Sequence, residues 1–219
     1  MHPFTKHLSL AFVLCLTAII ICAPAAMAKE EGYTDLFNGK DLSGWDGNPD
    51  FWSVDKGEIL GSTHEKRVKY NEFLISEKSY KDFSLKVKVW LENGNSGIQF
   101  RSKTLEKPWS VGGYQADVAV ETYYGMLYEE QGRGIMPYWN EKTDEERKAI
   151  FDVAKQGEWN EYEIICEGDH VKMILNGTVT CDIVDPDGAK EGIIALQIHT
   201  GPKMNVRFKD IRIKELNKK

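Results

Sequence analysis

The sequence predicts an all-β protein with a sandwich or jelly-roll architecture. Two observations lead to this prediction. After residue 28, most of the chain consists of short runs in which apolar and polar residues alternate, the pattern of antiparallel strands with one buried face. These runs are separated by Gly, Asn and Asp, which are typical of tight turns, and a single stretch has helical spacing.

The clearest strand covers residues 83–89, where FSLKVKV alternates strictly. The same alternation marks residues 98–101, 114–120, 162–167, 171–175, 179–184, 193–199 and 206–213. Turn residues at 167–169 (EGD) and 176–177 (NG) join three of these runs, so residues 162–184 are predicted to form a three-stranded meander. In the last run the apolar positions change parity near Lys209 and Asp210, which predicts a β-bulge.

One short helix is predicted in a loop excursion at residues 143–154. Thr143 and Glu146 have the spacing of a capping box, and apolar residues from Ala149 to Val153 follow at helical spacing.

Residues 1–28 have the features of a secretory signal peptide: Lys6, an apolar run at 8–22 and the small-residue sequence AMA at 26–28. The alternatives are an uncleaved membrane anchor, for which the run is short, and a lipid anchor on Cys22, which Ile21 disfavours. We therefore expect a periplasmic or extracellular protein without a stable membrane anchor. Residues 29–219 are long enough for one domain.

The formal net charge is −6 with both signs interspersed, and no basic block points to nucleic acid. Cys166 and Cys181 remain after signal cleavage and could form a disulfide, but their apolar surroundings favour buried thiols.

Three of the predicted strands carry amides and ionisable groups opposite their apolar residues. Because residues two apart in a strand point to the same face, neighbouring strands of this kind would line one polar surface suited to sugar hydroxyls. An ordinary solvated face is the alternative. The residues are Gln99 and Arg101, Gln115 and Asp117, and Gln197 and His199.

A second dense segment covers residues 123–135. Its adjacent carboxyls Glu129 and Glu130 and the Gly-flanked Arg133 could supply a base and a stabilising cation, or form only a charged turn. The Glu-x-Asp-x-Glu strand of laminarinase-like glycosidases is missing, since Ala119 lies between Asp117 and Glu121. His199 with Asp117, Glu129 or Glu130 could hold a divalent metal ion, although one histidine is a poor metal signature.

Six motifs, in order, resemble the 3-keto-disaccharide hydrolase domain family: LFNGKDLSGW (36–45), SGIQFR (96–101), GYQAD (113–117), LYEEQGRG (127–134), GEWN (157–160) and LQIHTGP (196–202). The resemblance implies a concanavalin A-like jelly roll and lyase and hydratase activity on glycosides oxidised at C3. A C3 ketone acidifies the C2 hydrogen, so elimination of the C1 substituent and rehydration would cleave the bond without a carboxylate pair.

Carried onto this chain, the resemblance implies a C2 base at His199 or Glu130, and enolate stabilisation by Arg101 and Arg133 or a bound cation. It also implies an upstream sugar 3-oxidoreductase as a partner. A lectin-like binding module and a conventional glycosidase remain alternatives. The implied substrate-binding residues are Gln99, Gln115, Asp117, Tyr128, Glu129 and Gln197.

Overall fold

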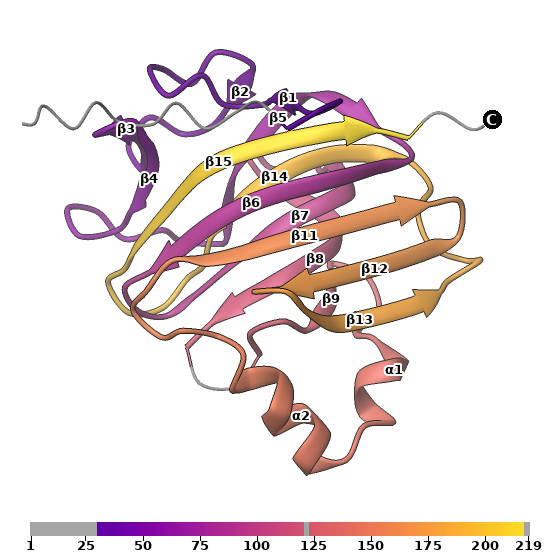
Figure 1. Cartoon of the computed structure of the whole chain (residues 1–219). Coiled ribbons are helices and arrows are strands. Elements are labelled where there is room, and N and C mark those ends of the chain that lie inside the picture. Colours follow the sequence, from indigo (N-terminus) through magenta and orange to yellow (C-terminus); the bar gives the residue numbers. More distant parts are fainter. Residues whose placement is uncertain (1–29, 121–122, 217–219) are drawn as a thin grey trace, which may run out of the picture. The chain divides into compact units, whose positions relative to one another are not determined.

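A computed structural model describes residues 30–120 and 123–216. The predicted signal peptide and Glu121 lie outside these residues. Two antiparallel sheets, which we call sheet A and sheet B, form a sandwich (Figure 1), so the all-β prediction is confirmed. None of the helices in the described ranges is long and apolar enough to cross a membrane.

Sheet A pairs its strands in the order β13-β12-β11-β6-β15-β4-β3, with β1 added on β15. Its members are β1 (Thr34–Asp35), β3 (Trp52–Asp55), β4 (Glu58–Ser62), β6 (Phe83–Leu91), β11 (Asn160–Glu167), β12 (His170–Leu175), β13 (Thr178–Val184) and β15 (Asn205–Glu215). The meander β11-β12-β13 and the bulge in β15, between Lys209 and Arg212, are as predicted.

Sheet B has the order β10-β9-β8-β7-β14-β5-β2. Its members are β2 (Trp45–Asp46), β5 (Glu72–Tyr80), β7 (Asn95–Thr104), β8 (Val111–Ala119), β9 (Leu127–Glu130), β10 (Gly134–Ile135) and β14 (Gly192–Ile198). The strands β1 to β5, β9 and β10 were not predicted from the sequence. The continuous apolar run at the start of β5 has no period-two pattern, because both faces of this strand are buried there.

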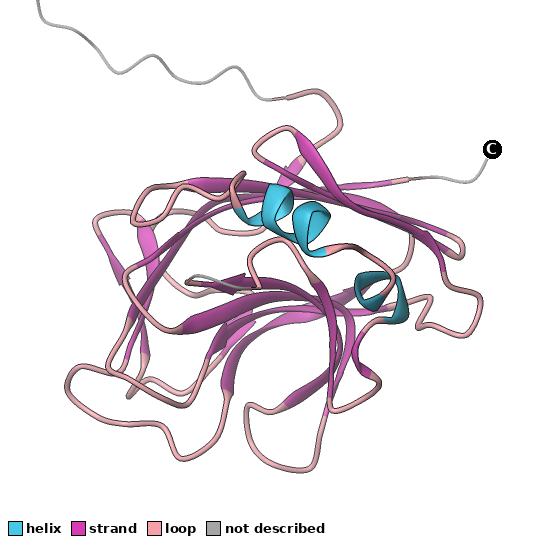
Figure 2. Cartoon of the chain, turned by 90° about the horizontal axis from the view of Figure 1, so that it is seen from below, coloured by secondary structure: helices cyan, strands magenta, loops and turns pink. Residues whose placement is uncertain are grey.

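Two short helices follow β10: α1 (Pro137–Asn140) and α2 (Asp144–Phe151). Figure 1 shows both at one edge of the sandwich, beside β13, and Figure 2 views the chain from that side, with the helices in cyan. The predicted capping box of α2 is present, since Thr143 Oγ1 accepts the Glu146 amide and the Glu146 carboxylate accepts the Thr143 amide. The helix α1 was not predicted.

The core lies between the sheets. It is built from the apolar alternation of β6, β7, β8 and β14, and each fully buried aliphatic side chain contributes about 1.5–3 kcal/mol. Cys166 and Cys181 are buried free thiols, as the sequence analysis favoured. Sheet A has one solvated face, whereas β7 and β8 in sheet B are buried on both faces. The residues of β7 and β8 on the outer face of sheet B are therefore buried as well, and they include the polar residues described next.

Candidate functional site

The three strands that carry the predicted polar surface are neighbours in sheet B, in the order β8-β7-β14. Gln99 lies directly opposite Gln115, and Gly97 lies opposite Asp117. Ile98 and its neighbours on the other face belong to the core. Because side chains alternate between faces, the two glutamines and Asp117 share the outer face of sheet B. The predicted adjacency of the three strands is confirmed.

A chain of buried hydrogen bonds runs across this face and ends at Asp117. Ser102 Oγ donates to Gln99 Oε1, Gln99 Nε2 donates to Gln115 Oε1, and Gln115 Nε2 donates to Asp117 Oδ1, each over 2.7 Å. Each amide accepts with its oxygen and donates with its nitrogen, so the direction of the chain is consistent throughout. The chain fixes the Asp117 carboxyl in one orientation.

Gly97 makes room for this arrangement. A Cβ atom at this position would lie 2.3 Å from Gln115 Cδ, closer than atoms can pack. The Gln115 side chain therefore crosses β7 where β7 has no side chain of its own.

Asp117 is almost fully buried, with 5% of its surface exposed. Burial raises the pKa of its carboxyl, the hydrogen bond from Gln115 lowers it and the charge of Glu130 raises it, and the net result is a pKa of about 7. Near neutral pH the Asp117 carboxyl is therefore present in both protonated and ionised forms.

Strand β9 adds a second carboxyl group to the same face. Tyr128 lies opposite Gln115 and Glu130 lies opposite Gly113, so both side chains point the way Gln115 points. Glu130 is 8% exposed and accepts a long 3.5 Å contact from Gln197 Nε2. Among the described residues, Gln197 Oε1 has no hydrogen-bond partner.

These residues surround a cavity of about 320 Å³ on the outer face of sheet B. It brings together five of the predicted site residues. Gln99 and Gln197 lie beneath it, with no exposed surface, and hold Gln115 and Glu130 in place. The lining residues are Asn71, Asn95, Gln115, Asp117, Tyr123, Met126, Tyr128, Glu130, Ile135 and His199.

His199 enters the cavity from the loop after β14. Its ring Nδ1 lies 2.5 Å from the Thr200 carbonyl oxygen. Since a carbonyl oxygen can only accept, Nδ1 carries the proton, and Nε2 of the neutral ring keeps its lone pair. His199 is therefore in the tautomer that a general base requires at Nε2.

Arg101 does not join this surface, and the prediction that it does is wrong. A β-bulge between Phe100 and Lys103 sets Arg101 and Ser102 together opposite Gly113, and Arg101 has φ 45°. The extra residue turns the Arg101 side chain away from the cavity.

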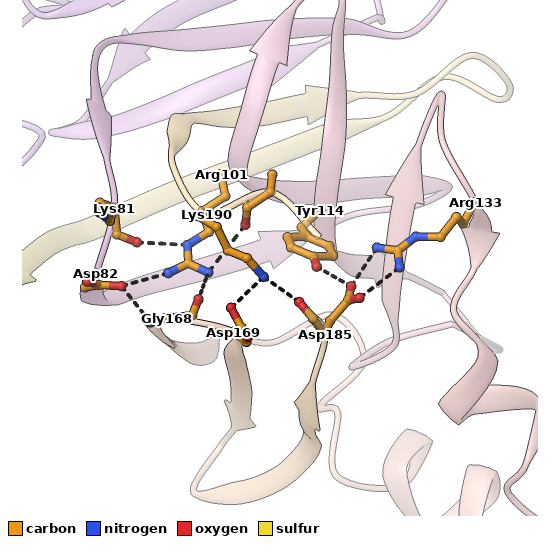
Figure 3. Close-up of polar contacts among 10 residues, drawn as sticks. Lys81, Asp82, Arg101, Tyr114, Arg133, Gly168, Asp169, Asp185 and Lys190 are labelled. Carbon is orange, nitrogen blue, oxygen red and sulfur yellow. Dashed lines mark hydrogen bonds and ion pairs between the residues drawn. The ribbon is translucent and has the colours of Figure 1, made fainter. Parts of the chain in front are cut away.

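The Arg101 guanidinium is 1% exposed and is held by the chain itself (Figure 3). It pairs with Asp82 at 3.0 Å and donates to the carbonyls of Lys81 and Gly168, each at 2.8 Å. Gly168 lies between β11 and β12 of sheet A, so Arg101 ties the two sheets together.

Glu129 and Arg133 also lie away from the cavity, contrary to the roles predicted for them. Glu129 is opposite Tyr114 and so points to the face that Glu130 does not. Arg133 forms an ion pair with Glu129. Its guanidinium also makes a two-pronged contact of 3.0 and 2.6 Å with Asp185, which in addition accepts a hydrogen bond from Tyr114 (Figure 3). The Arg133 hydrogen bond lowers the pKa of Asp185. Neither residue is among the described ones that line the cavity.

Asn71 and Asn95 line the cavity but were missed by the sequence analysis. Asn71 precedes β5, a strand that was not predicted, and its Oδ1 accepts the Thr200 amide at 3.0 Å. Asn95 begins β7, and within the described ranges its buried Oδ1 has no partner. The turn sequence NGN at 93–95 was the one available signal for Asn95.

The sequence analysis also considered a divalent metal ion held by His199 and the nearby carboxyls. Within the ranges that the structure covers, no group of three or more His, Cys, Asp and Glu side chains is arranged to hold a metal ion. What the cavity offers is acid–base chemistry among amide hydrogen-bonding groups: one carboxyl that titrates near neutrality, a second carboxyl and a histidine with a free ring nitrogen.

Fold and cavity together define a concanavalin A-like β-sandwich protein with a cavity on one sheet that is lined by two carboxyls and a histidine. Residues 32–214 match the 3-keto-alpha-glucoside-1,2-lyase-like domain, and the chain belongs to this family. No protein with a curated description matches the chain.

Solved structures share the fold. One from Parabacteroides distasonis, provisionally described as a glycosyl hydrolase, is 23% identical, with a TM-score of 0.62 over 85% of this chain and 95% of its own. The carbohydrate-binding module CBM66 from Bacillus subtilis is 17% identical (TM-score 0.56, 78% and 96% covered). A β-glucanase from Bacillus licheniformis is 13% identical (TM-score 0.53, 84% and 97% covered). These likenesses establish the fold alone.

Proposed function

We propose that this protein is an exported enzyme that cleaves glycosides of 3-keto sugars by elimination and hydration across C1 and C2. The family supports the substrate class. The observation that carries the proposal is the buried carboxyl of Asp117, with a pKa of about 7, in the same cavity as His199 and Glu130. A group that titrates near the working pH is effective in proton transfer.

In the elimination, His199 Nε2 removes the proton from C2 of the keto sugar. The electron pair of the C2–H bond moves toward the C3 carbonyl, which becomes an enolate. As the enolate collapses, a C1–C2 double bond forms and the C1–O bond breaks. The leaving oxygen keeps the electron pair of the C1–O bond and takes the proton from His199. The products are an alcohol and an unsaturated keto sugar with its hydroxyl on C2.

Hydration runs the same steps backwards with water in place of the alcohol. Water adds its oxygen to C1 and a proton returns to C2, so the net reaction is hydrolysis without oxidation or reduction. Glu130 accepts a hydrogen bond from the leaving alcohol and then from the incoming water.

The enolate oxygen needs a hydrogen-bond donor, and neither arginine that was predicted for this role lines the cavity. Asp117 in its protonated form supplies one. A neutral carboxylic acid kept protonated by burial can donate to an oxygen on which negative charge develops. Gln115 occupies one Asp117 oxygen, which leaves the other for this contact.

The test is loss of the C2 hydrogen. A 3-keto-glucoside carrying deuterium at C2 should release that deuterium into water during turnover, and the reaction in D₂O should place deuterium at C2 of the product. Cleavage with complete retention of the C2 label would contradict elimination and favour ordinary glycoside hydrolysis. Binding without cleavage would favour a lectin-like module.

A further inference from the structure

Ser102 begins the chain of buried hydrogen bonds across the outer face of sheet B, and the β-bulge in β7 gives it this place. In a regular strand, residue 102 would share the core face with Phe100. The bulge turns the Ser102 hydroxyl toward the outer face instead, where its Oγ lies 2.7 Å from Gln99 Oε1. The irregularity that takes Arg101 away from the cavity therefore brings a hydroxyl to this face.

The two amides in this chain cannot turn around one at a time. Gln99 Nε2 donates to Gln115 Oε1, so reversing either amide alone would set two nitrogens or two oxygens against each other. All four side chains of the chain are at most 5% exposed, so water cannot repair such a mismatch. The amides therefore keep one common direction, and the groups at the two ends of the chain decide it.

At one end, Ser102 supplies the donor that the observed direction requires. Gln99 Oε1 accepts the hydroxyl proton. The next oxygens around Ser102 Oγ are the carbonyls of Phe100 at 3.1 Å and Tyr114 at 3.3 Å, and carbonyls only accept. Without the hydroxyl, Gln99 Oε1 would lose its donor, and the surrounding carbonyls would favour the amino end of the Gln99 amide.

At the other end, the direction of the chain decides which Asp117 oxygen carries a proton. Gln115 presents its Nε2 to Oδ1, so Oδ1 accepts, and Oδ2 carries the proton of the neutral acid. With both amides reversed, Gln115 Oε1 would face the carboxyl and take up its proton in a hydrogen bond. The acid would then have no proton to donate into the cavity.

We propose that Ser102 is a positioning residue, whose hydroxyl holds the two amides in the direction that keeps the Asp117 proton on the oxygen facing away from Gln115. The effect on turnover rests on the proposed function, whereas the direction of the chain can be measured without it. The other titratable groups around Asp117 stay unchanged in the variants below. They are Tyr128 and Glu130 on β9, His199 after β14, Tyr123 in the cavity wall, Tyr138 on α1 and Tyr162 on β11.

The test removes the hydroxyl in Ser102→Ala and follows the Asp117 carboxyl by ¹³C NMR across a pH series, with Asp117→Asn to assign the signal. The ionised carboxyl loses the amide donor that stabilises it, so the pKa of Asp117 should rise by about one pH unit or more. Turnover of a 3-keto-glucoside should fall at least about tenfold, because Gln115 then binds the proton of the acid. Ser102→Cys keeps a weaker donor of similar size and should lie between Ser102→Ala and wild type.

Ser76→Ala is the matched control. Ser76 is a buried serine on β5 of the same sheet, and its Oγ donates to the Lys78 carbonyl at 2.8 Å and accepts the Ile194 amide at 3.0 Å. This variant should lose about as much stability as Ser102→Ala, since each loses the hydrogen bonds of one buried hydroxyl. It should keep the wild-type titration of Asp117 and the wild-type kcat.

An unchanged or lowered pKa of Asp117 in Ser102→Ala would overturn the inference and leave Ser102 a structural role only. If Ser102→Ala does not fold, the same titration of Ser102→Cys decides. A raised pKa with undiminished kcat would overturn the effect on turnover. If the wild-type protein cleaves no keto compound, the proposed function fails, while the titration still judges the direction of the chain.

Discussion

Gln115 donates a hydrogen bond of 2.7 Å to one oxygen of the Asp117 carboxyl, and both side chains line the cavity while being almost fully buried. The contact holds the carboxyl in place and stabilises its ionised form. Burial and the charge of Glu130 act in the opposite direction and prevail, which puts the pKa of Asp117 near 7. This balance underlies the first two predictions.

The alkaline limb of the pH–rate profile should report the proton on Asp117. Since the protonated form donates to the enolate, turnover should fall as the pH rises through about 7. Asp117→Asn keeps a neutral donor at this position and should lose that limb while retaining part of the activity. An unchanged limb in the variant would assign the titration to another group.

Stability should depend on pH through the same residue. The pKa of Asp117 in the folded state, about 7, exceeds its ordinary value of 3.8. The folded state therefore binds more protons between these values, and its stabilisation is lost as the pH rises through them. Each pKa unit corresponds to about 1.4 kcal/mol. Chemical denaturation should show Asp117→Asn gaining stability relative to wild type as the pH rises from about 4 to about 7, by about 1.4 kcal/mol per pH unit, with no further gain above that range. A constant difference would contradict this.

His199→Gln should lower turnover by about 10²–10⁴-fold, because the cavity loses its base. Binding of an unoxidised glycoside, measured by calorimetry, should stay close to wild type. If the wild-type protein shows no turnover and His199→Gln lowers its affinity for the glycoside, the lectin-like alternative is favoured instead.

Gly97→Ala should displace Gln115 and with it Asp117, since the new methyl group would lie 2.3 Å from Gln115 Cδ. We expect a loss of stability of about 1–3 kcal/mol from overpacking, together with reduced turnover. The matched control is the double variant Gly97→Ala/Gln115→Ala, in which the shortened side chain should recover most of the stability. Additive losses in the double variant would contradict the contact.

Arg101→Met should act on stability and not on chemistry. It leaves the buried Asp82 carboxylate unpaired, at a cost of about 3–5 kcal/mol. Asp82→Asn together with Arg101→Met should recover part of that loss. The folded fraction should keep the wild-type kcat. A large drop in kcat at unchanged free energy of unfolding would instead indicate that Arg101 takes part in catalysis.

The part of the site that the sequence predicted is the part that follows from strict alternation. Gln115 and Asp117 are two residues apart in a regular strand, so their common face could be read from the sequence. In the sequence Arg101 follows the same alternation, but the bulge between Phe100 and Lys103 breaks it, and nothing in the local pattern distinguishes the two cases.

Residues contributed by loops could not be predicted in this way. Asn71 reaches the cavity because the loop before β5 is bonded to Thr200, a contact between positions 129 residues apart. Such long-range contacts are set by tertiary packing and have no local signature. In β9, by contrast, alternation alone would have separated Glu129 from Glu130 had the strand been identified.

The most direct test of the proposed function uses a 3-keto-glucoside and its unoxidised parent with the same chromogenic aglycone. The protein lacking residues 1–28 is incubated with each, with and without a chelator, and aglycone release is followed. Release from the keto compound alone is the predicted result, and the chelator shows whether a cation contributes. Release from the parent as well, or from neither compound, would contradict cleavage by elimination.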